Sequence, residues 1–165
     1  MASGYNLRVQ KFGGPKVEKP FVLIVDDNEA TCTLITALLQ NEFAVETAHD
    51  GQEAIEKIRH RNYATILLDL LMPFVDGYGV LDFLRAERPD LLSHVLVVTA
   101  SLSPRELERV RAYEIAGLIA KPFEVDTLFA AVRQCAGEKA PPFMRGPLLS
   151  SGMILFLAEV VLKRV

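Results

Sequence analysis

Five short, mostly apolar segments, each followed by a segment with helical periodicity, constrain the fold of this chain most strongly. The apolar segments are residues 21–25, 44–48, 64–68, 95–98 and 118–120. Strands that are apolar on both faces are typical of parallel sheets covered on both sides, because half-exposed strands alternate polar and apolar residues. The alternation with helices therefore predicts an α/β, doubly wound domain with a five-stranded parallel sheet and helices on both faces.

Local signals predict where the helices begin. Asn28 can cap a helix whose apolar residues, from Leu34 to Leu39, share one face. Ser103 is followed by Pro104 and then by Glu106, which is the pattern of a serine cap with a capping box.

The last helix, within 124–136, has Val125, Leu128, Phe129 and Val132 at the spacing of one buried face. Gly137 follows it and is expected to end it.

Charge is unevenly distributed along the chain. Residues 21–137 contain ten Lys and Arg against eighteen Asp and Glu, a net charge of −8, whereas residues 1–20 and 138–165 are net basic. Phosphate contacts require clustered Lys and Arg side chains. We therefore expect no nucleic-acid binding by the acidic central domain.

The two flanking segments differ from the central one in composition. Residues 1–20, with several Gly and Pro residues, predict a flexible basic N-terminal arm. Residues 138–165 predict a Pro/Gly linker followed by an apolar C-terminal tail at 148–162. This apolar tail is shorter than the ~20 residues of a membrane span. A docking or dimerising helix, a weak interfacial membrane contact and an unrelated extension all remain open for this tail.

The cysteines and the N-terminus favour a cytoplasmic protein. Cys32 and Cys135 lack the spacing of a metal motif, and their positions on their helices place them too far apart for a disulfide. No apolar segment of a secretion signal is present at the N-terminus.

The residues that carry chemistry follow the strands. Asp26 and Asp27 end the first strand, Asp69 the third, Thr99 the fourth and Lys121 the fifth. A single carboxylate at such a position can be an ordinary loop residue, but the carboxyl ends of these strands meet at one edge, where ligands bind. Three carboxylates in one crevice repel one another and are expected to be held by a cation. Oxygen ligands that leave room for phosphate favour Mg²⁺.

With these residues the chain resembles the receiver domain of response regulators, of the single-domain chemotaxis type, over residues 21–137. The resemblance is carried by Ile24-Val25-Asp26-Asp27-Asn28, Ala48-His49-Asp50-Gly51-Gln52-Glu53-Ala54, Asp69-Leu70-Leu71-Met72-Pro73 with Asp76-Gly77, Thr99-Ala100 and Lys121-Pro122-Phe123. It implies the flavodoxin-like strand order 2-1-3-4-5. It also implies a signalling phosphoacceptor in a two-component phosphorelay, which catalyses only its own phosphoryl transfer and hydrolysis.

Matched residue by residue, the resemblance makes Asp69 the phosphoryl acceptor. Asp27 would bind Mg²⁺ directly and Asp26 mostly through water, and the backbone carbonyl of Leu71 would be a further ligand. The phosphoryl oxygens would be bound by Thr99 and Lys121. The implied phosphodonor is a histidine kinase or phosphotransfer protein, and the implied surface for a downstream protein target comprises Ser103–Lys121 and helix 124–136.

Leu118, three residues before Lys121, departs from the family pattern, because many receivers have Tyr or Phe there. A leucine at this switch position favours an output signal that depends more on the helix after Pro104. It also leaves open that the protein is a pseudo-receiver, which binds its partners without phosphorylation. An Asp-nucleophile phosphohydrolase of the haloacid-dehalogenase type is a further alternative. That class needs Asp-x-Asp after its first strand, and the sequence from Val25 to Asn28 does not supply it.

Overall fold

A parallel five-stranded sheet forms the centre of the molecule in the computed structural model, which describes residues 18–100 and 103–137. Its strand order is β2-β1-β3-β4-β5, which is the order that the resemblance implied. The strands are β1 (Phe21–Val25), β2 (Ala44–Ala48), β3 (Thr65–Leu68), β4 (Val95–Thr99) and β5 (Gly117–Ala120). The predicted doubly wound α/β fold is confirmed.

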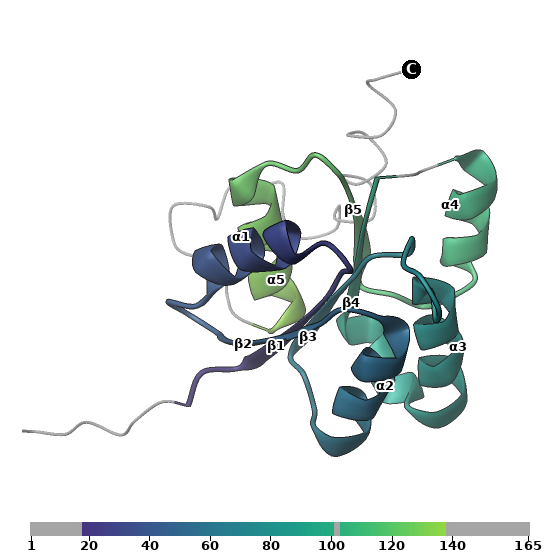
Figure 1. Cartoon of the computed structure of the whole chain (residues 1–165), viewed down its shortest axis with the longest axis horizontal. Helices are drawn as coiled ribbons and strands as arrows, with labels where there is room; N and C mark the ends of the chain where they lie inside the picture. The colour runs from purple at the N-terminus through teal and green to yellow at the C-terminus, as the bar shows by residue number, and fades with distance from the viewer. Residues whose placement is uncertain (1–17, 101–102, 138–165) are drawn as a thin grey trace, which may run out of the picture.

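The helices cover both faces of this sheet, and Figure 1 shows α1 and α5 on one side with α2, α3 and α4 on the other. Their bounds are α1 (Glu29–Leu39), α2 (Gly51–His60), α3 (Gly77–Glu87), α4 (Pro104–Arg111) and α5 (Val125–Cys135). Each layer has its own apolar core. Ile35 and Leu128 belong to the first core, and Leu81 and Val110 belong to the second.

The predicted helix caps form as the sequence indicates. The side chain of Asn28 accepts a hydrogen bond from the backbone N–H of Thr31 at 3.1 Å. Ser103 and Glu106 form the capping box, in which each side chain bonds the backbone N–H of the other residue. Gly137 follows α5 with a φ of +74°, a left-handed conformation that favours glycine.

Two residues expected on buried helix faces are exposed instead. Leu34 is 53% exposed and Val125 is 43% exposed. Ile35 and Leu39 occupy the part of α1 that faces the sheet, so Leu34 lies at the edge of the apolar stripe. Val125 is the first residue of α5, and Leu128 in the next turn is fully buried.

A short 3₁₀-helix, η1 (Pro89–His94), joins α3 to β4 and begins at a proline. It buries Leu91 and Leu92 in the core that contains Leu81. This connection lies at the amino ends of the strands, away from the edge that carries the acidic residues.

Cys32 and Cys135 are both free thiols, as expected. No helix in the part of the chain that the structure describes is long and apolar enough to span a membrane. Residues 1–17 of the predicted arm and residues 138–165 of the predicted tail lie outside the described residues.

Candidate functional site

The strand register brings the acidic residues of β1 and β3 together at one edge of the sheet. Val25 pairs with Leu68, so Asp26 and Asp69 leave adjacent strands at the same level. The backbone N–H of Asp69 donates to the carbonyl of Val25 at 2.9 Å, which extends the ladder to the acidic residue itself.

The same edge receives the ends of β4 and β5. Thr99 pairs with Ala120, and the backbone N–H of Lys121 donates to the carbonyl of Thr99 at 2.9 Å. Thr99 is fully buried at this position. The sheet therefore brings all five predicted strand-end residues to one edge.

Three carboxylates form a compact cluster there. One carboxylate oxygen from each of Asp26, Asp27 and Asp69 lies within 4.8 Å of the others. Asp26 is 3% exposed and Asp69 is 7% exposed, whereas Asp27 is open to solvent. Oxygen donors at this spacing, with one side open, fit a hard divalent cation that keeps part of its water shell.

Lys121 is the cation that faces these carboxylates. Its Nζ lies 2.6 Å from Oδ2 of Asp26 and 2.6 Å from Oδ2 of Asp69. Burial alone lowers the pKa of Lys121, but its hydrogen bonds to the two carboxylates and their charges outweigh burial and raise the pKa. One ammonium against three carboxylates leaves the cluster with a net charge of −2, which favours a further cation.

Backbone amides fix the second oxygen of each buried carboxylate. Oδ1 of Asp26 accepts from the N–H of Asn28 at 2.9 Å, and Oδ1 of Asp69 accepts from the N–H of Leu71 at 3.0 Å. Each carboxylate thus has one oxygen on the backbone and the other on Lys121. This arrangement holds both carboxylates in a defined orientation.

The loop after β3 is packed closely against the chain around it. The N–H of Gly77 donates to the carbonyl of Leu70 at 3.1 Å, and a Cβ at position 77 would lie 2.3 Å from the carbonyl oxygen of Asp69. Gly51 makes a similar close approach, because its N–H donates to the carbonyl of Val75 at 3.0 Å. Only glycine allows the backbone to approach this closely, so both glycines set the position of the loop.

Two apolar side chains in the loop after Asp69 are exposed, which the sequence pattern did not predict. Leu71 is 54% exposed, and Phe74 is 95% exposed with a φ of +65°. A left-handed conformation at a phenylalanine has no local sequence signal, since this region favours Gly, Asn and Asp. Leu118, the predicted switch position, is half-buried and packs against the core beneath α2, α3 and α4.

The model of the family described as "Response regulator receiver domain" matches residues 22–133. The chain belongs to this family. The match covers nearly all of the described receiver domain, from β1 into α5.

Curated relatives of this receiver domain include mycobacterial regulators. The chain is 32% identical over 139 residues to the transcriptional regulatory protein TcrA of Mycobacterium tuberculosis, covering 79% of this chain and 51% of that protein. It is 36% identical over 115 residues to the response regulator MprA of Mycobacterium ulcerans, covering 68% of this chain and 48% of that protein. The chain thus spans about half the length of the curated relatives it matches.

Solved receiver structures share the fold. The receiver domain of the Francisella response regulator 1452 has a TM-score of 0.65 and 28% identity, covering 72% of this chain and 98% of that one. The receiver domain of the sensor histidine kinase PA1611 from Pseudomonas aeruginosa, described with a magnesium ion coordinated in the active site cleft, has a TM-score of 0.66 and 26% identity, covering 73% and 99%. The receiver family is one of signalling proteins rather than enzymes that act on a separate substrate.

Proposed function

We propose that this receiver domain is a phosphoacceptor in a two-component phosphorelay and that Asp69 takes the phosphoryl group. The observation that carries the proposal is the setting of the Asp69 carboxylate. One of its oxygens is held by the Leu71 N–H and the other by Lys121, and the carboxylates of Asp26 and Asp27 lie beside it. A strand-end carboxylate with only a local capping role would not need this set of partners.

The residues fit a Mg²⁺ site at the carboxylate cluster. Asp27 would bind the ion directly, Asp26 mostly through water, and Asp69 and the backbone carbonyl of Leu71 would complete the protein ligands. Two observations support this fit. The hard oxygen donors lie within 4.8 Å of one another, and the three carboxylates together with the Lys121 ammonium have a net charge of −2. When bound, Mg²⁺ would supply positive charge to offset the charge on the phosphoryl oxygens.

The reaction is a transfer from a phosphohistidine on a partner protein. A carboxylate oxygen of Asp69 attacks the phosphorus, the phosphorus–nitrogen bond breaks, and the histidine leaves as a neutral imidazole after taking up a proton. An acyl phosphate on Asp69 results. Because phosphoryl transfer needs little covalent chemistry from the protein, the chain contributes position and charge: Lys121 binds one phosphoryl oxygen and Thr99 another.

Phosphorylation places roughly −1.5 to −2 charges at the end of β3. Thr99 ends β4 and precedes α4, and Lys121 follows β5. The contacts of these two residues with the phosphoryl group therefore shift segments that reach the surface. To convert a mostly inactive population into a mostly active one, the phosphoryl group must favour the active form by about 5 kcal/mol. Charge-assisted hydrogen bonds from these two residues supply part of that free energy.

The phosphodonor is a histidine kinase or a phosphotransfer protein, and the downstream target is a protein that binds the surface made by Ser103–Lys121 and helix 124–136. The receiver comprises residues 21–137, between the N-terminal arm 1–20 and the linker and tail 138–165. The location is cytoplasmic, which the two cysteines without a disulfide or metal spacing support. The acidic character of the receiver, with its net charge of −8, supports protein partners over nucleic acid.

The experiment that tests this function is incubation of the full chain with phosphoramidate and Mg²⁺, followed by intact-mass measurement. Wild type gains the mass of one phosphoryl group, and Asp69→Asn gains none. Asp76→Asn is a matched control, because Asp76 is an exposed acid that caps α3 nearby. Absence of the adduct together with absence of beryllofluoride binding would favour a pseudo-receiver that acts without phosphorylation.

A further inference from the structure

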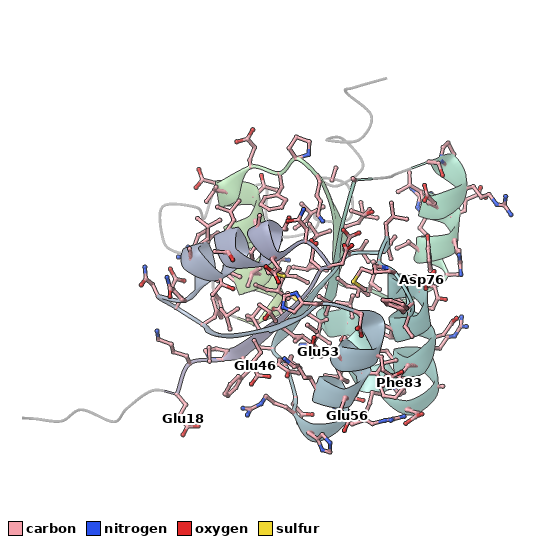
Figure 2. All side chains as sticks on the ribbon, in the orientation of Figure 1. Glu18, Glu46, Glu53, Glu56, Asp76 and Phe83 are labelled. Atoms are coloured by element: carbon pink, nitrogen blue, oxygen red, sulfur yellow. The ribbon has the colours of Figure 1, made fainter. Side chains whose placement is uncertain are left out.

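A second site lies between α3 and α4, next to the loop that follows the phosphoacceptor. It is a pocket of about 630 Å³, within the usual range for ligand sites. Figure 1 shows α4 beside α3, and Figure 2 labels Asp76 at the end of α3 that meets this loop. The side chains that matter for recognition are Leu71, Met72, Asp76, Tyr78, Arg105 and Arg109.

Each acidic side chain of the pocket already accepts a hydrogen bond from a backbone N–H at the start of its own helix. Oδ1 of Asp76 accepts from the N–H of Gly79 at 2.9 Å. Glu106 also lines the pocket, and its Oε2 accepts from the N–H of Ser103 at 3.0 Å and from the hydroxyl of Ser103 at 2.6 Å. Both carboxylates therefore serve as helix caps at termini that favour negative charge.

The two arginines of the pocket have no such carboxylate partner. Neither Arg105 nor Arg109 forms an ion pair with any residue in 18–100 or 103–137, and both are exposed. The guanidinium carbon of Arg109 lies 3.5 Å from the centre of the Tyr78 ring. Stacking of this kind leaves the in-plane N–H groups of the arginine available to a bidentate acceptor. Arg105 lies one helical turn before Arg109 on the same side of α4.

Tyr78 adds an independent indication of a ligand. The residue is only 5% exposed, and its buried hydroxyl has no hydrogen-bond partner among the described residues. Native proteins rarely leave a buried hydroxyl unpaired, so such a group calls for an explanation. Burial raises the pKa of Tyr78, which keeps the hydroxyl protonated and able to donate at neutral pH.

We propose that this pocket binds an acidic peptide segment of a partner protein. Arg105 and Arg109 hold one Asp or Glu carboxylate of the partner, and the hydroxyl of Tyr78 donates a hydrogen bond to it. An apolar neighbour of that acid packs on Leu71, which is 54% exposed, and on Met72. A carboxylate fits better than a phosphate because the acids of Asp76 and Glu106 stand in the same pocket and repel a second negative charge.

The pocket is built on the segments that phosphorylation would displace. Leu70 and Leu71, which line it, directly follow Asp69 in the chain, and α4 follows the strand that ends at Thr99. This part of the inference rests on the proposed function. Peptide affinity should change when a phosphoryl mimic occupies Asp69, whereas the recognition of the carboxylate depends only on the pocket.

The test uses the full chain, ¹⁵N-labelled, and two capped peptides that differ in one residue, Gly-Leu-Glu-Leu-Gly and Gly-Leu-Gln-Leu-Gly. We expect the Glu peptide to cause saturable NMR shifts at Tyr78, Gly79 and Arg109, and the Gln peptide to cause none. Arg109→Gln should weaken the Glu peptide roughly tenfold, which is the loss of one charge-assisted contact. Arg111→Gln, on the same helix but outside the pocket, should leave the affinity unchanged.

Tyr78→Phe is the second variant, because it keeps the ring and removes only the hydroxyl. It should weaken the Glu peptide by roughly threefold to tenfold while the protein stays folded. Absence of saturable shifts with the Glu peptide, equal shifts with the Gln peptide, or equal shifts with inorganic phosphate alone would overturn the peptide site.

Beryllofluoride with Mg²⁺ separates the two proposals. We expect it to shift the signals next to Asp69 and to change the affinity for the Glu peptide about threefold or more. Shifts near Asp69 with unchanged peptide affinity would overturn the coupling. If beryllofluoride caused no shift near Asp69, the proposed function would fail, and the two peptides would still decide whether the pocket binds a carboxylate.

Discussion

The ammonium nitrogen of Lys121 lies 2.6 Å from Oδ2 of Asp69, although the two residues are 52 positions apart in sequence. The same nitrogen lies 2.6 Å from Oδ2 of Asp26. Lys121 therefore bridges the proposed phosphoacceptor and one proposed metal ligand, and it must exchange part of this contact for a phosphoryl oxygen on phosphorylation.

Replacing Lys121 with Met is expected to destabilise the protein at pH 7. The substitution leaves two buried carboxylates facing each other without a cation, a change that costs about 3 kcal/mol when the charges are well buried. Because the Lys121 side chain retains 19% exposure, we expect about 1–3 kcal/mol in urea unfolding. Added Mg²⁺ should restore part of this loss. Equal stability of the variant and wild type without Mg²⁺ would contradict the bridging role.

The raised pKa of Lys121 has a consequence at high pH. A group whose pKa is higher in the folded than in the unfolded state contributes stability below its unfolded pKa, which is about 10.4 for lysine, and this contribution is lost as pH rises through the folded pKa. The free-energy difference between wild type and Lys121→Met should thus be constant from pH 7 to 9. Urea unfolding above pH 10.5 should show it shrinking.

Mg²⁺ should raise the melting temperature of wild type and should fail to do so for Asp27→Asn. Asp27 is exposed, so the substitution removes a metal ligand without opening the core. At a Mg²⁺ concentration 100 times the dissociation constant, the expected stabilisation is about 2.7 kcal/mol. Glu29→Gln provides the matched control, because Glu29 is an exposed acid in the first turn of α1. An equal Mg²⁺ response from Asp27→Asn and Glu29→Gln would be incompatible with the site.

Gly77→Ala is expected to cost about 1–3 kcal/mol and to slow phosphorylation. The new methyl group would meet the carbonyl oxygen of Asp69 at 2.3 Å and Cα of Leu70 at 2.7 Å, and both are backbone atoms that cannot turn aside. Gly79→Ala is the comparison, since its nearest neighbour is a side-chain methyl of Val75 at 2.8 Å. Chemical unfolding should rank Gly77→Ala below Gly79→Ala, and the reverse order would rule out the close approach at position 77.

The contact between α5 and the turn after α1 should produce an acid-dependent loss of stability. A hydrogen bond from Arg133 lowers the pKa of Glu42 by more than burial raises it. The folded-state pKa is below the unfolded value, so the contribution is present above about pH 4.3 and is lost as pH falls through the folded pKa. The Glu42 side chain is 36% exposed, which limits the contribution to about 1 kcal/mol. Glu42→Gln should therefore destabilise at pH 7 and match wild type near pH 3.

Leu118→Ala tests the switch position. The leucine is half-buried and has no hydroxyl to bond α4, so we expect phosphorylation and the beryllofluoride-induced NMR shifts of α4 to persist in the variant. Loss of the α4 shifts with phosphorylation intact would show that Leu118 transmits the signal after all.

The residues at the strand ends were predictable because two regular features coincide. The apolar runs before Asp69 and Asp26 fix where the strands end, and parallel strands in a doubly wound sheet end at one edge. The caps at Asn28 and Ser103 were predictable for a similar reason, because a cap depends on residues only two or three positions away.

Other features depend on contacts that a linear pattern does not contain. The bond from Lys121 to Asp26 depends on the register of separate strands and on the reach of a flexible side chain. The exposure of Leu34 depends on where the edge of the sheet lies beneath α1. The left-handed conformation of Phe74 runs against the backbone preference of phenylalanine, so the residue itself does not signal it.

The identity of the residue that carries the phosphoryl group tests the proposed function most directly. The full chain, treated with phosphoramidate and Mg²⁺, can be reduced with borohydride, which converts an aspartyl phosphate to homoserine, and then digested for peptide mass spectrometry. We predict homoserine at position 69 and at no other aspartate. Homoserine at Asp26 or Asp27, or none in a protein shown to be folded and to bind Mg²⁺, would contradict the proposed role of Asp69.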